Sequence, residues 1–233
     1  MMTSRLTFLF DLDGTLLDTD HLHFEAYRTL LAEHGRTITQ AYYNENIMGA
    51  PNSAIMQRLF PDMPEHRHRA LSDLKEELFR TSLEGPQVPK AGLPALLDWA
   101  EANGVACCVV TNAPRPNAER MLASLGLAHR LPELVIGEEL EHGKPHPMPY
   151  LEGLRRTGGS AERALAFEDS GPGVQSASSA GIFTFGMLGA LGEAALKKAG
   201  AAQVIPDFTS PLLGDVIKSM SQGVVPPTAR ALV

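Results

Sequence analysis

Cysteine is scarce in this 233-residue chain, and its scarcity limits the fold and the compartment. The two cysteines, Cys107 and Cys108, are adjacent within an apolar stretch. Neighbouring residues on a strand point to opposite faces, so these two are poor disulfide partners. We therefore expect no disulfide framework, and buried structural thiols in a reducing cytoplasm.

Positive charge is also in short supply. The chain has 20 Lys and Arg against 27 Asp and Glu, a formal net charge of -7. Nucleic-acid binding depends on clustered basic residues, and no such cluster is present, so we expect no nucleic-acid partner. No apolar run approaches the roughly 20 residues that span a bilayer. Residues 1–5 lead directly into a short apolar run instead of a signal peptide, so we expect a cytoplasmic protein without a membrane partner.

Hydrophobic residues, by contrast, make up 44% of the chain, enough for one full core and a small second domain. Short apolar runs predict buried strands at residues 6–12, 105–110, 133–136, 164–167, 182–185 and 202–205. Helical segments between them are predicted at residues 93–103, 117–125, 148–157, 173–180 and 193–199. This alternation indicates an α/β fold, a parallel sheet with helices on both faces. Ligands of such sheets bind beyond the carboxyl ends of the strands.

One long segment interrupts the alternation. From about Thr19 to Gln87 the sequence has helical periodicity, for example at residues 23–34, 52–60 and 66–82. A structureless loop of that length is not expected in a compact domain. We predict a core at 1–17 and 89–233, a helical domain at 18–88, and a loosely ordered tail at 221–233.

The strongest motif is Asp-Leu-Asp-Gly-Thr at residues 11–15, which ends the first predicted strand. Residues two apart on a strand face the same way, so Asp11 and Asp13 are expected to converge on one point. Gly14 permits a tight turn that lets a phosphate approach the backbone. Two carboxylates this close repel each other unless a cation or a proton lies between them. The alternative is that Asp-Gly only closes the strand as turn residues.

Two further loops carry groups suited to a phosphate. The second strand ends in Thr111 and Asn112, whose hydroxyl and backbone N–H groups could hold phosphoryl oxygens, although Thr-Asn is also ordinary turn material. Lys144 precedes a proline before the helix predicted at 148–157. It supplies a positive charge next to a rigid proline. The alternative is a solvated lysine in a turn, which would have the same sequence pattern.

Acidic residues end the fourth predicted strand. Glu168 and Asp169 lie between this buried strand and a helix, where they make a suitable pair of magnesium ligands. The alternative is that Asp169 or Ser170 only caps the helix.

In combination and in this order, the four motifs resemble the haloacid dehalogenase superfamily, specifically its phosphatase and β-phosphoglucomutase-like branch with a helical cap. The resemblance covers the core and the helical segment, and it implies a Rossmann-like parallel sheet with an all-helical cap domain inserted after the first strand. The dehalogenases lack the second aspartate, so Asp13 argues against a halide substrate. No catalytic position is missing, which argues against a catalytically inactive binding module.

The resemblance also implies a mechanism and a set of site residues. Asp11 would attack phosphorus to form an aspartyl-phosphate, and Asp13 would protonate the leaving alcohol and later deprotonate the attacking water. Magnesium would be held by Asp11, the backbone carbonyl of Asp13 and Asp169, with Glu168 as a neighbouring acid. The phosphoryl oxygens would be neutralised by Thr111, the backbone of Asn112 and Lys144.

The resemblance places substrate choice largely in the cap. His21 and His23 lie where related phosphomutases carry a hinge histidine, and His23 is the better match; the alternative is a solvated or packed pair. The loop with Gly49 resembles a specificity loop. Mutases acting on phosphoglucose have an arginine where this chain has Asn52, and phosphonoacetaldehyde hydrolases have a Schiff-base lysine near the same place. Lys75 approximates the second hinge residue of the mutases.

We therefore expect a magnesium-dependent phosphatase that acts on a small phosphorylated metabolite, such as a sugar phosphate, as a monomer or small homo-oligomer. A phosphomutase is the alternative, because Glu168, Asp169 and His23 also resemble that branch.

Overall fold

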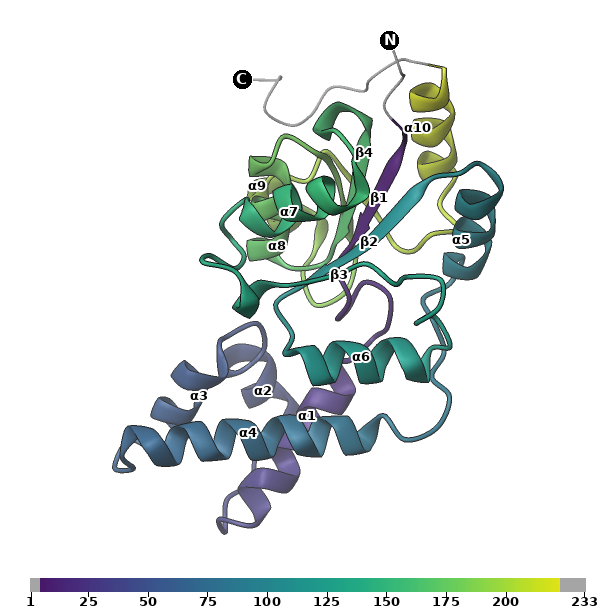
Figure 1. The fold of residues 1–233 in the computed structure, drawn as a ribbon. Helices are drawn as coiled ribbons and strands as arrows, with labels where there is room; N and C mark the ends of the chain where they lie inside the picture. The colour runs from purple at the N-terminus through teal and green to yellow at the C-terminus, as the bar shows by residue number, and fades with distance from the viewer. Residues whose placement is uncertain (1–4, 223–233) are drawn as a thin grey trace. The chain divides into compact units, whose positions relative to one another are not determined.

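The computed structural model describes residues 5–222. Two compact units are present: Thr19–Pro86, called the helical unit below, and the core unit, which is formed by the chain before and after that segment (Figure 1). The tail predicted to be loosely ordered starts at Ser221, which ends a helix. Its residues from 223 onward lie outside the described residues.

A six-stranded parallel sheet forms the centre of the core unit. Its strands are β1 (Thr7–Phe10), β2 (Ala106–Thr111), β3 (Leu134–Ile136), β4 (Ala164–Glu168), β5 (Phe183–Met187) and β6 (Gln203–Ile205). The order is β3-β2-β1-β4-β5-β6, and every neighbouring pair is parallel. The predicted sheet is thus confirmed. β2 and β3 lie on one side of β1, and β4, β5 and β6 lie on the other side. The strand order therefore reverses at β1.

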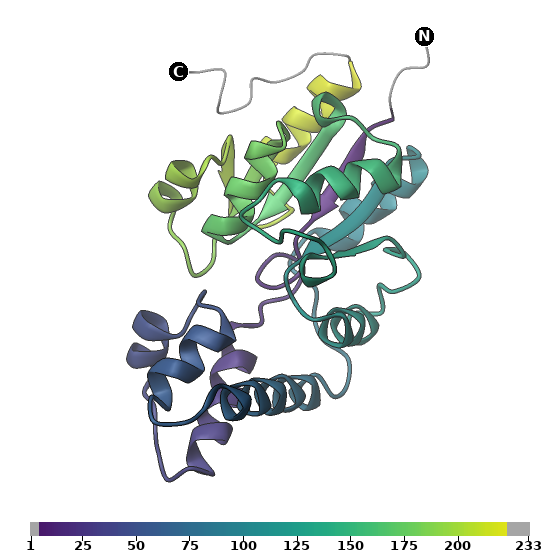
Figure 2. The ribbon, with the colours of Figure 1, turned by 60° about the vertical axis from the view of Figure 1, so that its left-hand side comes forward.

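Helices cover both faces of the sheet (Figures 1 and 2). Successive strand residues alternate between the faces. Leu9 belongs to a buried cluster with residues of α7 (Met148–Thr157) and α8 (Gly171–Ser179). Phe8 and Phe10 point the other way, and Phe8 stacks on Trp99 of α5 (Leu93–Ala102), with ring centroids 6.1 Å apart. Near-continuous apolar strands are the pattern expected when both faces are covered.

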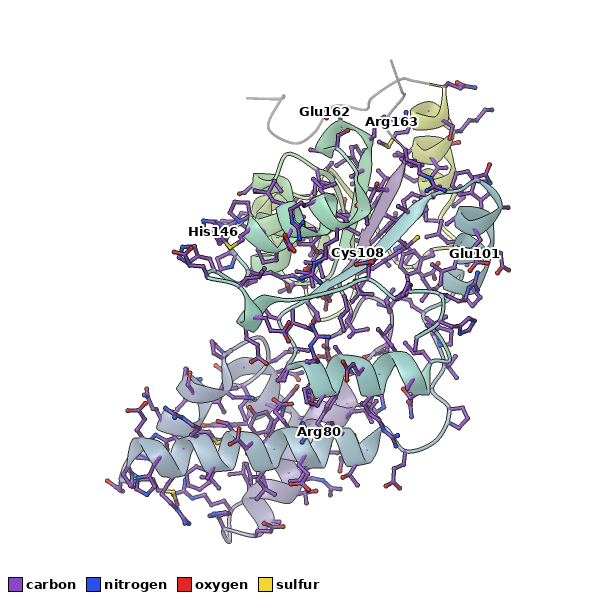
Figure 3. All side chains as sticks on the ribbon, in the orientation of Figure 1. Arg80, Glu101, Cys108, His146, Glu162 and Arg163 are labelled. Atoms are coloured by element: carbon purple, nitrogen blue, oxygen red, sulfur yellow. The ribbon has the colours of Figure 1, made fainter. Side chains whose placement is uncertain are left out.

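The remaining elements of the core unit lie between and after the strands. They are α6 (Arg115–Ser124), η1 (Gly137–Glu139), η2 (Ala161–Arg163), α9 (Glu193–Ala199) and α10 (Pro211–Ser221). α10 was not predicted from the sequence, although it buries four residues at helical spacing: Leu213, Val216, Ile217 and Met220. Cys108 lies on β2 (Figure 3), is fully buried and, like Cys107, is a free thiol.

The helical unit contains α1 (Asp20–Ala32), α2 (Gln40–Asn46), α3 (Asn52–Leu59) and α4 (Glu65–Ser82). These helices share a buried apolar cluster that includes Leu30, Met56 and Leu71. α2 was not predicted from the sequence; it has only seven residues and is polar apart from Ala41 and its two tyrosines. Its start is fixed by Thr39, whose hydroxyl accepts a hydrogen bond from the backbone N–H of Tyr42. Among the described residues, no helix is both long enough and apolar enough to cross a bilayer.

Candidate active site

The first motif lies in a loop, not on the strand as predicted. β1 ends at Phe10, and the backbone N–H of Asp11 makes one more ladder hydrogen bond, to the carbonyl of Phe167, at 2.9 Å. Gly14 then turns the chain with φ +73°, and a Cβ there would overlap the carboxylate of Asp169. The alternation of strand side chains therefore does not orient Asp13. Only glycine at position 14 permits this loop to lie so close to Asp169.

Three carboxylates from two neighbouring strand ends come together. One oxygen each of Asp11, Glu168 and Asp169 lies within 4.8 Å of the others, the only such group of His, Cys, Asp or Glu found among the described residues. β1 and β4 are paired, which explains this proximity. A set of hard, anionic oxygens this close fits a divalent cation such as Mg²⁺. The side chain of Asp13 is not part of the group.

Lys144 provides the compensating charge inside this cluster. Its ammonium donates to Asp11 Oδ1 at 2.6 Å, to Glu168 Oε1 at 2.5 Å and to the carbonyl of Val110 at 2.7 Å. Its side chain is 3% exposed. Burial lowers the pKa of Lys144, but the charges of Asp11 and Glu168 outweigh burial, so the net pKa is raised and the ammonium stays protonated.

Asp11 experiences the opposite balance. Burial and the neighbouring charges of Glu168 and Asp169 raise the pKa of its carboxyl well above the usual value, and Lys144 only partly counteracts them. Three acidic groups surround one ammonium in this cluster, and a bound cation would favour the ionised form of Asp11.

The end of β2 positions the loop that carries Lys144. Asn112 forms two hydrogen bonds with the backbone of Lys144: its Nδ2 donates to the carbonyl at 3.3 Å, and its Oδ1 accepts from the N–H at 3.2 Å. Thr111 is buried, and its hydroxyl accepts from the backbone N–H of Ala113 at 3.0 Å. The same loop is tied to α8, since Ser176 donates to the carbonyl of His146 at 2.6 Å.

Two further polar residues contact the cluster. Of these, Ser170 was considered from the sequence only as a helix cap, and Tyr150 was not predicted. Ser170 caps α8 by accepting from the N–H of Gly173, as the alternative interpretation stated, but its hydroxyl also donates to Glu168 Oε2 at 3.0 Å. Tyr150 is fully buried and donates to Glu168 Oε1 at 3.0 Å. No sequence signal identifies Tyr150, because a tyrosine on the apolar face of a helix is ordinary core material.

The residues predicted for substrate choice lie in the helical unit. His23 stacks on Phe79 with ring centroids 4.1 Å apart, and its Nδ1 accepts from Lys75 Nζ at 2.9 Å. Gly49 has φ +75° and an unobstructed Cβ position.

Asn52 belongs to the same polar network. Its Oδ1 accepts from the Tyr27 hydroxyl at 2.6 Å, and its Nδ2 donates to Glu76 Oε1 at 2.5 Å. Lys75 also donates to Glu76, at 3.0 Å. The structure thus joins His23 and Asn52 through Lys75 and Glu76, while Gly49 lies apart from these contacts.

The fold agrees with comparisons to known proteins. Residues 8–187 match the family of haloacid dehalogenase-like hydrolases. The chain belongs to this family. It is 32% identical to the phosphorylated carbohydrates phosphatase of Thermotoga maritima, over 90% of this chain and 98% of that protein. It is also 32% identical to the fructose-1-phosphate phosphatase YqaB of Escherichia coli, over 75% of this chain and 92% of that protein.

A solved structure extends the likeness to three dimensions. CbbY from Rhodobacter sphaeroides, crystallised in complex with phosphate, superposes with a TM-score of 0.76 at 25% identity, covering 88% of this chain and 96% of that one. The family's fold, with its parallel sheet, is therefore shared over nearly the whole chain, and the chain is a hydrolase of this family.

Proposed function

We propose that the protein is a magnesium-dependent phosphatase that hydrolyses a small phosphate monoester, such as a sugar phosphate, through an aspartyl-phosphate on Asp11. The observation that supports this most is the 2.6 Å contact between Lys144 Nζ and Asp11 Oδ1 inside a buried acidic cluster. It places an oriented carboxylate beside a fixed positive charge that attracts an anionic ester. Relatives named as phosphatases of phosphorylated carbohydrates and of fructose 1-phosphate support the substrate class.

In the first proposed step, an oxygen of Asp11 forms a bond to phosphorus while the bond from phosphorus to the alcohol oxygen breaks. Asp13 donates a proton to that alcohol oxygen. In the second step, water attacks the phosphorus, Asp13 accepts the water's proton, and the bond between Asp11 and phosphorus breaks to release inorganic phosphate.

The other residues of the site would hold the phosphoryl group. Lys144 would act on its oxygens as a fixed charge, because its three N–H bonds already meet acceptors of the protein. Thr111 and the backbone of Asn112 would donate to the same oxygens. Magnesium, held by Asp11, Asp169 and the carbonyl of Asp13, would supply positive charge to the phosphoryl oxygens and to the crowded carboxylates.

The surroundings of Asn52 favour a phosphatase over a phosphomutase. A mutase must hold a bisphosphorylated intermediate by its second phosphate, a task suited to forked, cationic donors. Asn52 is neutral, and its amide is already hydrogen-bonded to Tyr27 and to the carboxylate of Glu76. Burial raises the pKa of the Glu76 carboxyl, but the charge of Lys75 and the hydrogen bond from Asn52 lower it by more. The net pKa is below the usual value, so the carboxylate is ionised. Asn52 itself therefore offers no positive charge to a second phosphate.

A panel of phosphorylated metabolites, assayed for release of inorganic phosphate with magnesium present, tests the phosphatase proposal. At least one small monoester should be hydrolysed, and Asp11→Asn should lower that rate by roughly 1,000-fold or more, since losing an essential transition-state interaction costs several kcal/mol. Hydrolysis at the normal rate by Asp11→Asn would contradict Asp11 as the nucleophile.

Phosphorus NMR separates the phosphatase from the mutase. With glucose 1-phosphate or glucose 6-phosphate as substrate, the inorganic phosphate signal should grow while the two esters do not interconvert. Interconversion faster than phosphate release would overturn the phosphatase assignment.

A further inference from the structure

Tyr150 is a fully buried polar residue for which the proposed reaction has no role. It lies on α7, six residues beyond Lys144 in the chain, and has no exposed surface. Its hydroxyl reaches Glu168 Oε1 at 3.0 Å, and its ring lies 5.3 Å from the ammonium of Lys144. Tyr150 therefore contacts both members of the ion pair next to Asp11.

Glu168 is held by four hydrogen bonds from the protein. Oε1 accepts from Lys144 Nζ at 2.5 Å and from Tyr150 at 3.0 Å, while Oε2 accepts from the N–H and the hydroxyl of Ser170, at 3.2 Å and 3.0 Å. A carboxylate offers about four lone-pair positions, so these bonds fill its capacity. A fully buried carboxylate needs hydrogen-bond donors to replace water, and Glu168 has them. Glu168 is therefore a fixed negative charge opposite Lys144.

Lys144 depends on that counter-charge for its place. A lysine ammonium is a point charge on a flexible stem, so its acceptors decide where it lies. Of its three acceptors, the Val110 carbonyl is part of β2, Asp11 is the proposed nucleophile, and Glu168 is the remaining charged anchor. Rotation of the Glu168 carboxylate would change the direction of the Lys144–Asp11 contact.

We propose that Tyr150 is a positioning residue: its hydroxyl fixes Glu168 Oε1, and Glu168 in turn fixes the Lys144 ammonium against Asp11. This inference rests on the proposed function of the site. Without the hydroxyl, Oε1 would keep a single donor and the carboxylate could rotate. The substrate does not need to contact Tyr150, so the effect should fall on kcat and not on KM.

The test is steady-state hydrolysis of an aryl phosphate by the full chain carrying Tyr150→Phe, which keeps the ring and removes the hydroxyl. We expect kcat to fall roughly 10-fold, with KM within about twofold, since one hydrogen bond to a charged group is lost. The matched control is Thr184→Val. It removes a buried hydroxyl that donates to the carbonyl of Ile182 at 3.0 Å and not to the acidic cluster, and it should leave kcat unchanged.

A double-mutant cycle separates positioning from packing. If Tyr150 acts through Glu168, then Tyr150→Phe should lower kcat by less than about twofold in a Glu168→Ala background, which lacks both acceptor oxygens, whereas independent effects would multiply. Multiplying effects, or an unchanged kcat in the single variant, would overturn the proposal. Absence of phosphate release by the unmodified protein from every ester tested would instead refute the proposed function itself.

Discussion

At the scale of single residues, Asp11 and Asp13 are two positions apart but have different surroundings. Asp11 is 7% exposed and contacts Lys144, whereas Asp13 is half-buried in the loop that Gly14 turns. A nucleophile benefits from a dry, fixed environment, and a group that exchanges protons with substrate and water benefits from partial exposure. The two carboxylates therefore suit the two different roles proposed for them.

Replacing Asp13 with Asn should separate the two chemical steps. An aryl phosphate has a good leaving group that needs little protonation, so Asp13→Asn should still be phosphorylated on Asp11. Hydrolysis of the phosphoenzyme needs a base, however, and should slow by roughly 100-fold or more. Intact-protein mass spectrometry should show a gain of one phosphoryl group, and the same mass gain should be absent in Asp11→Asn. No accumulation in Asp13→Asn with an activated ester would contradict the role of Asp13.

At the scale of elements, α4 carries a buried ion pair. Lys75 and Glu76 are neighbours on this helix, with side chains 4% and 13% exposed and a distance of 3.0 Å between Nζ and Oε1. The Lys75 ammonium also lies 5.3 Å from the Tyr27 ring and 5.5 Å from the Phe79 ring. Breaking a buried pair leaves an uncompensated charge, so removing either partner alone should destabilise the helical unit strongly.

Glu76→Gln should lower the free energy of unfolding by about 3 kcal/mol at pH 7, because it leaves Lys75 buried without its counter-charge. The pKa of Glu76 is lowered in the folded protein. Its stabilisation is therefore present above its unfolded pKa of about 4.3 and is lost as pH falls through the folded value. The difference in unfolding free energy between the unmodified protein and the variant, measured in urea, should shrink below that pH.

Glu77→Gln is the matched control, since Glu77 is the next residue on α4 and is exposed. It should change stability by less than about 0.5 kcal/mol. Equal losses for the two variants, or a difference that is constant with pH, would contradict a stabilising role for the Lys75–Glu76 pair.

At the scale of the whole molecule, the candidate site is assembled from segments far apart in the chain. Asp11 follows β1, Thr111 ends β2, Glu168 ends β4, and Lys144 lies in the loop before α7. They meet because β1 pairs with β2 on one side and with β4 on the other. An ion or substrate bound there should stabilise the folded core unit, since unfolding separates the residues that bind it.

Magnesium at a concentration 100-fold above its Kd should stabilise the folded protein by about 2.7 kcal/mol. The thermal unfolding temperature should rise accordingly. Asp169→Ala should greatly reduce that shift, because it removes an anionic oxygen from a hard cation. Asp215→Ala, an exposed acid on α10, should preserve it. A chelator should abolish both the shift and phosphate release. Full activity in excess chelator would contradict the metal-dependent mechanism.

Much of the fold could be predicted from local patterns. Apolar runs between helical periods identified all six strands, because strands covered on both faces are apolar along their length. The ends of the strands were predicted less accurately. β1 was predicted to continue to residue 12 but ends at Phe10, because the turn at Gly14 withdraws the chain from the ladder and apolar Leu12 does not reveal this. The short, polar α2 was missed because its capping and packing, not its periodicity, define it.

The sequence by itself determined which chemical groups this protein has at the ends of its strands. An acidic pair at residues 11 and 13, a lysine in a loop and a second acidic pair are legible as residue types at fixed spacing. The tertiary structure alone decided which of these groups touch. Lys144 lies between Asp11 and Glu168, Asn112 holds the backbone of Lys144, and Tyr150 holds Glu168. Hydrogen bonds between residues so distant in the chain depend on sheet order and helix packing, for which a single sequence has no local pattern.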